Sequence, residues 1–141
     1  MEYYLGEMYE NGYGSLPKDG TQAASWYRKA AEYGDPQMQN NVAWSFATSS
    51  DPAIRNPAAA LEYARKAVNA EKDHPDPNHL DTLAEACYVN QQYDEAVKTE
   101  QQALSLASPE LVSPENKSEF EKRLEKYQLA LQTNKHPLAA K

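Results

Sequence analysis

The chain has 141 residues, of which 40% are hydrophobic and only five are glycine, a composition suited to one helical domain. Its formal net charge of −7 disfavours a nucleic-acid surface, because such a surface neutralises phosphates with clustered Lys and Arg. No apolar run approaches the ~20 residues of a membrane span, and no segment alternates as a strand does. We therefore expect an all-α protein without nucleic acid, membrane or cofactor as a partner.

The spacing of apolar residues, together with the prolines and capping residues between segments, predicts helices at residues 2–11, 20–33, 36–48, 57–70, 78–90, 93–107 and 114–132. Proline is tolerated in the first turn of a helix, so Pro36, Pro57 and Pro77 are expected at helix starts. Asp35 and Asn56 directly precede two of these prolines and are plausible N-caps. Residues 133–141 are expected to form a flexible tail.

A repeat relates the stretch SWYRKAAEYG at 25–34 to LEYARKAVNA at 61–70. Ala23, Ala60 and Ala96 follow one another at intervals of 37 and 36 residues. Small residues at such fixed positions let two antiparallel helices approach closely, which predicts a helical hairpin in each unit. Three hairpins, at about 1–35, 36–72 and 77–107, would stack to complete a shared core within one domain, residues 1–132.

The last helix, 114–132, differs from the hairpins because it has no partner helix of its own. Phe120, Leu124, Tyr127 and Leu131 form a single apolar stripe at helical spacing. The other faces are rich in Glu and Lys. This helix is expected to cap the last hairpin, with its remaining faces in solvent.

The first unit contains a recognisable set of residues: Leu5, Gly6, Tyr9, Gly12, Gly14, Asp19, Ala23, Trp26, Tyr27, Ala30, Ala31 and Gly34. In this arrangement the unit resembles a SEL-one-like repeat, a relative of the tetratricopeptide repeat. The third unit is similar to an ordinary tetratricopeptide repeat, and the middle unit is intermediate. The resemblance implies a right-handed α–α superhelix that serves as a protein-binding adaptor, or scaffold, holding peptides or other proteins.

In this architecture the first helix of each hairpin would line a concave groove. A helical wheel turns Asn40, Asn41 and Trp44 away from the packing stripe of their helix. The third unit leaves these side chains on or beside its open face: Asp81, Glu85 and Tyr88. The six residues predict an acidic and aromatic groove for a protein or peptide with Lys or Arg. Alternatively, Trp44 packs against the neighbouring hairpin, and the polar residues are simply solvated.

The stretch HPDPNHLD at 74–81 is the strongest hint of site chemistry. It places His74 and His79 near Asp73, Asp76 and Asp81, which is compatible with metal binding. Proline-interrupted spacing favours a solvated turn instead, so no metal site is assigned. Cys87 occupies a packing position and is interpreted as a buried structural thiol. No residues point to a catalytic centre, and we expect no enzyme activity.

A structural role is the alternative to peptide binding. The chain could be the terminal part of a longer array, or a self-associating module, because Tyr3, Tyr4 and Leu5 lie beside an open end of the solenoid. An upstream repeat or a second copy in a homodimer would cover them. A single cysteine needs no oxidising compartment, which makes the cytoplasm the default location. A removed leader would leave a periplasmic or secreted location open.

Overall fold

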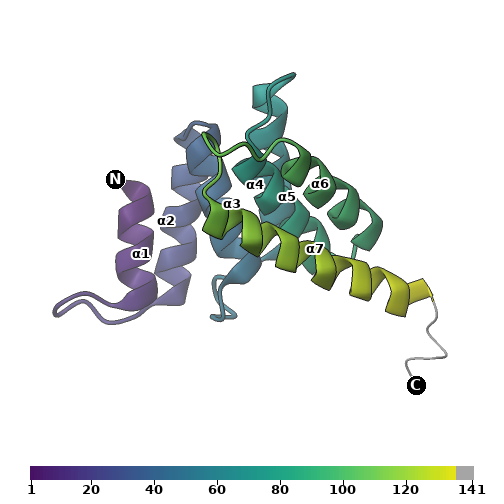
Figure 1. The fold of residues 1–141 in the computed structure, drawn as a ribbon. Coiled ribbons are helices and arrows are strands. Elements are labelled where there is room, and N and C mark those ends of the chain that lie inside the picture. The colour runs from purple at the N-terminus through teal and green to yellow at the C-terminus, as the bar shows by residue number, and fades with distance from the viewer. Residues whose placement is uncertain (136–141) are drawn as a thin grey trace.

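The computed structural model describes residues 1–135, which fold into helices joined by short loops (Figure 1). The helices are α1 (Glu2–Asn11), α2 (Gly20–Tyr33), α3 (Pro36–Thr48), α4 (Pro57–Glu71), α5 (Pro77–Val89), α6 (Tyr93–Ser105) and α7 (Pro114–Lys135). Their bounds lie within two residues of the predicted ones, except at the end of α7. This helix continues through residues 133–135, where a tail was predicted. The rest of that tail, 136–141, lies outside the described residues.

The predicted starts of α3 and α4 are confirmed by their N-caps. The Asp35 carboxylate accepts a hydrogen bond from the backbone N–H of Met38 at 2.9 Å. The Asn56 side-chain oxygen accepts one from the backbone N–H of Ala59 at 3.0 Å. Each cap satisfies a donor that the first helical turn leaves without an intrahelical partner.

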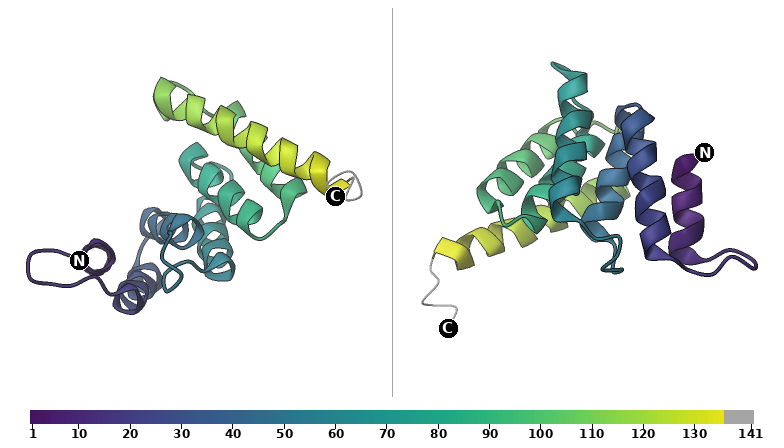
Figure 2. Two further views of the ribbon diagram at one scale, coloured as in Figure 1. Left: turned by 90° about the horizontal axis from the view of Figure 1, so that it is seen from below. Right: turned by 180° about the vertical axis from the view of Figure 1, so that it is seen from behind.

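Consecutive helices pair as α1/α2, α3/α4 and α5/α6, and the three hairpins follow one another along a curved solenoid (Figures 1 and 2). Ala23, Ala60 and Ala96 are each 0% exposed, at matching places in successive hairpins. The predicted repeat and the all-α superhelical architecture are thus confirmed. Among the described residues, no helix combines the length and the apolar character needed to cross a lipid bilayer.

In the first hairpin, α1 and α2 lie so close together that position 6 has no room for an alanine side chain. A Cβ at Gly6 would lie 2.5 Å from two ring atoms of Tyr27, well inside van der Waals contact. By the repeat interval, Ala64 and Glu100 hold the positions equivalent to Tyr27 in the second and third units. The second unit can therefore accept Ala43 where the first requires glycine.

The last helix crosses α5 and α6 at the end of the solenoid (Figure 1). Phe120 and Tyr127 are buried, while Leu124 and Leu131 are partly buried, so the predicted stripe faces the protein. The helix caps the third hairpin as expected. Its neighbouring basic residues are not all solvated, however, and this difference shapes the site described next.

Candidate partner-binding groove

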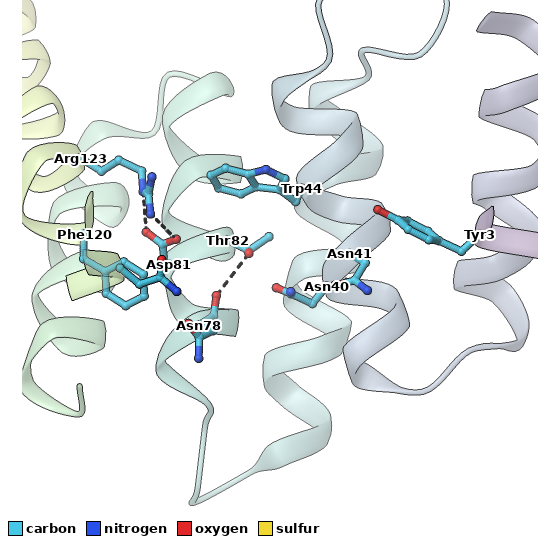
Figure 3. A pocket seen from close by; sticks show the side chains of 10 residues that line it. Tyr3, Asn40, Asn41, Trp44, Asn78, Asp81, Thr82, Phe120 and Arg123 are labelled. Atoms are coloured by element: carbon cyan, nitrogen blue, oxygen red, sulfur yellow. Dashed lines mark hydrogen bonds and ion pairs between the residues drawn. The ribbon is translucent and has the colours of Figure 1, made fainter. Parts of the chain in front are cut away.

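A pocket of about 260 Å³ opens where α3, α5 and α7 face one another, with one side chain contributed by α1 (Figure 3). It lies on the first helices of successive hairpins, which is where a groove was predicted. Its lining residues are Tyr3, Asn40, Asn41, Trp44, Asn78, Asp81, Thr82, Asn116, Phe120 and Arg123.

Asparagine amides form much of the pocket wall. Asn40 is 8% exposed, and its side-chain oxygen Oδ1 has no hydrogen-bond partner among the described residues. The neighbouring Asn41 accepts a hydrogen bond from Nε2 of Gln37 at 2.9 Å. Leaving a buried acceptor unpartnered costs about 1–3 kcal/mol, so the Asn40 amide is a feature that a ligand could satisfy.

Trp44 extends along the pocket wall towards α7 (Figure 3). The guanidinium carbon of Arg123 lies 5.3 Å from the centre of the indole ring, within the range of a cation–π interaction. The indole is partly buried. Trp44 therefore lines the pocket and also contacts the capping helix. Neither predicted alternative included this contact with the capping helix.

The acidic residues of the groove are paired within the chain. Nε and Nη2 of Arg123 donate hydrogen bonds to the two carboxylate oxygens of Asp81, at 2.7 and 2.9 Å. Glu85 accepts a hydrogen bond from the Tyr127 hydroxyl and lies 3.4 Å from Nζ of Lys126. The groove is therefore less acidic than the sequence indicated, because α7 supplies the basic partners that were expected from a ligand.

The structure brings only part of the predicted site together. Asn40, Asn41, Trp44 and Asp81 share the pocket, whereas Glu85 and Tyr88 lie outside its wall beside α7. The ring of Tyr88 lies 5.0 Å from that of Tyr127 and 4.5 Å from Nζ of Lys126, measured to ring centres. These last two predicted residues thus hold the capping helix.

A buried carboxyl group lies behind the Asp81 pair. Glu100 is 0% exposed, and neither side-chain oxygen has a hydrogen-bond partner among the described residues. Burial, reinforced by the negative charge of Asp81, raises the pKa of Glu100 to about 10. Glu100 is therefore protonated at neutral pH. Burial also raises the pKa of Asp81, although the Arg123 guanidinium opposes that shift.

Sequence reasoning missed the contribution of α7 to the pocket. Asn116, Phe120 and Arg123 line it, yet the helix was assigned a capping role alone. A signal was present, because Arg123 falls three residues after Phe120 and four before Tyr127, on the edge of the apolar stripe. Cys87, by contrast, is a buried free thiol as predicted, and burial raises its pKa.

The hairpin stack and its groove define a superhelical repeat protein. The sequence profile of the Sel1 repeat matches residues 1–35 and 36–71, which are the first two hairpins. The chain therefore belongs to the Sel1 repeat family, whose members are generally protein-interaction scaffolds and typically not enzymes. The match confirms the resemblance seen in the first unit and extends it to the middle one. No curated protein and no solved structure matches the chain significantly.

Proposed function

We propose that this chain is a protein-interaction scaffold that binds an extended peptide segment in the pocket between α3, α5 and α7. The unpartnered Oδ1 of Asn40, buried in the wall of that pocket, carries the proposal. A peptide backbone offers one N–H donor and one C=O acceptor per residue, and an asparagine amide can bond to both. Four asparagines around one pocket suit main-chain recognition.

Aromatic side chains supply the anchoring surface in this proposal. Trp44 and Phe120 both line the pocket, and both lie within 6 Å of the Arg123 guanidinium. An apolar side chain of the ligand would gain affinity here by displacing water from the rings, since a few such anchors carry most of the energy of an interface. A Lys or Arg of the ligand would instead compete with Arg123 for Asp81.

A peptide array tests the proposal. The parent chain, Asn40→Ala and Trp44→Ala would each be screened, with Trp26→Ala as the matched control because this second tryptophan lies on α2 and outside the pocket. Loss of the same peptides in both pocket variants, with the control unaffected, is the expected result. Unchanged binding in both pocket variants would refute the proposal. Asp81→Asn measures separately whether basic peptides are selected, because Asp81 is the carboxylate in the pocket wall.

Self-association through the first hairpin is a second candidate function. Tyr4 is 65% exposed and Tyr33 is 81% exposed, and large aromatic residues at the surface are common where proteins associate. Light scattering over a range of concentrations would reveal a homodimer as a rise in mass. A Tyr4→Ser variant should remain monomeric under the same conditions, and a concentration-independent monomer in the parent would eliminate this candidate.

A further inference from the structure

His79 lies where three helices meet, and oxygen atoms face both of its ring nitrogens. Nδ1 is 2.9 Å from Oε1 of Glu71 at the end of α4. Nε2 is 3.2 Å from Oε1 of Gln37 on α3, and 4.0 Å from Oδ2 of Asp76. The histidine is 4% exposed, so the protein rather than solvent determines what its nitrogens meet.

The polar neighbours of the two ring nitrogens are acceptor oxygens. Glu71 accepts the Nδ1 proton, and Nε2 faces Oε1 of Gln37, so a proton or a cation must lie between Nε2 and that oxygen. The Gln37 amide nitrogen is already engaged, since it donates to Oδ1 of Asn41 at 2.9 Å. A metal ion between Nε2 and the oxygens of Gln37 and Asp76 would satisfy all three atoms.

We propose that Nε2 of His79, Oε1 of Gln37 and Oδ2 of Asp76 bind a divalent transition-metal ion such as Zn²⁺. Tetrahedral Zn²⁺ with ligand distances of 2.0–2.2 Å separates neighbouring ligand atoms by about 3.4 Å. The observed separations from Nε2, 3.2 and 4.0 Å, lie on either side of that value. Imidazole nitrogen with carboxylate and amide oxygens is a donor set that such ions accept.

The surrounding groups support this assignment. Glu71 accepts the Nδ1 proton and so fixes the tautomer that leaves Nε2 free for a metal, as carboxylates do behind metal-binding histidines. Oδ1 of Asp76 accepts the backbone N–H of Asn78 at 2.8 Å as the N-cap of α5, while Oδ2 points to the histidine. The Asp76 side chain is 33% exposed, which gives an ion and a fourth, water ligand access.

A bound ion would join the second and third hairpins, because Gln37 belongs to α3 whereas Asp76 and His79 belong to the start of α5. The sequence had placed His79 beside His74, but His74 is exposed and Gln37 comes from a unit 42 residues away. An ion that binds only the folded chain stabilises it by mass action. Zinc should therefore raise the unfolding temperature.

Zn²⁺ titration by calorimetry, together with thermal unfolding, tests the site. The parent should bind one Zn²⁺ per chain and unfold at a higher temperature when zinc is present. Both effects should disappear in His79→Gln and persist in His74→Gln, the matched control on the neighbouring loop. Asp76→Asn keeps a side chain that caps helices well, so its weaker zinc binding would report the lost ligand and not a lost cap.

Two further variants keep the test decisive if His79→Gln fails to fold. Gln37→Glu replaces an amide oxygen ligand with a carboxylate and should tighten zinc binding. Glu71→Gln should weaken it by about tenfold or more, as expected for a group that orients a ligand. A parent that binds no zinc would overturn the proposal. So would a zinc response that all of these variants share, because it would mean adventitious binding elsewhere.

Discussion

Arg123 and Asp81, 42 residues apart in the sequence, form two parallel hydrogen bonds of 2.7 and 2.9 Å between α7 and α5. The Asp81 side chain is 8% exposed and that of Arg123 is 20% exposed, so water screens the pair only weakly. The same guanidinium faces the rings of Trp44 and Phe120. One side chain thus connects the capping helix, the groove wall and the third hairpin.

Replacing Arg123 with Met should destabilise the protein by about 3 kcal/mol, because Asp81 would be left as a buried charge without a partner. Urea unfolding followed by circular dichroism measures the change. The double variant Asp81→Asn with Arg123→Met should lose less unfolding free energy than the two single variants lose in sum, since both charges are absent.

Lys122 provides the control for this experiment. Its side chain is 67% exposed, and its ion pair with Glu119 lies at the surface, where such pairs contribute little. Lys122→Ala should leave the free energy of unfolding almost unchanged. If Lys122→Ala lowered the free energy of unfolding as much as Arg123→Met does, the buried pair would have no special role.

Glu100→Gln should stabilise the protein, and the gain should grow with pH. The folded-state pKa of about 10 lies above the ordinary value of 4.5, so the folded chain binds one more proton than the unfolded chain between these values. Stability from this group is fully present below pH 4.5 and falls by about 1.4 kcal/mol per pH unit above it. Glutamine, which does not titrate, removes that loss.

Urea unfolding at about pH 6 and about pH 8 checks this expectation. The difference in unfolding free energy between Glu100→Gln and the parent should be larger at the higher pH. Glu110→Gln, a change at an exposed residue between α6 and α7, is the control. An equal difference at both pH values would mean that Glu100 is not protonated in the folded chain.

Gly6→Ala should destabilise the first hairpin by about 1–3 kcal/mol, as overpacking does, because the added Cβ meets the Tyr27 ring at 2.5 Å. The combination of Gly6→Ala with Tyr27→Ala recreates the pair found in the second unit, Ala43 with Ala64. In a protein that already carries Tyr27→Ala, Gly6→Ala should lower the stability much less. Thermal unfolding of all four proteins measures the coupling, and additive effects would contradict the steric explanation.

Cys87 should react slowly with a thiol reagent in the folded protein, because it is 2% exposed and burial raises the pKa of its thiol. Urea should release one rapidly reacting thiol per chain, since the sequence has no other cysteine. Arg123→Met should speed the native reaction, because Cys87 shares a buried cluster with Tyr127 of α7. Immediate reaction of the folded parent would contradict this burial.

Most of the fold could be predicted because its determinants are local. Pro36 and Pro57, with the caps that precede them, define helix starts within a few residues of sequence. The alanine repeat then identifies the faces that pack together, and the buried Ala23, Ala60 and Ala96 confirm it. The end of α7 was missed although the sequence carries a stop signal, because Pro137 lies two residues beyond Lys135 and a proline shortly after a helix marks its end.

The candidate site was harder to predict because it depends on which helices meet. Asp81 and Glu85 form an acidic helix face in the sequence, and nothing within their own unit indicates that α7 will neutralise them. Glu100 was missed for a related reason, since its repeat position is buried in every unit but is filled by Tyr27 and Ala64 in the others. Long-range pairing of charges leaves no periodic pattern in one sequence.

The pocket draws its walls from four helices that belong to successive levels of the stack, from Tyr3 on α1 to Arg123 on α7. A solenoid can bend and change its pitch along its axis, since each repeat contacts only its neighbours. Any change in pitch would widen or narrow this opening. A peptide bound across the opening would restrict this motion in the helices that it contacts, from α1 to α7. The bound protein would therefore be stiffer than the free one.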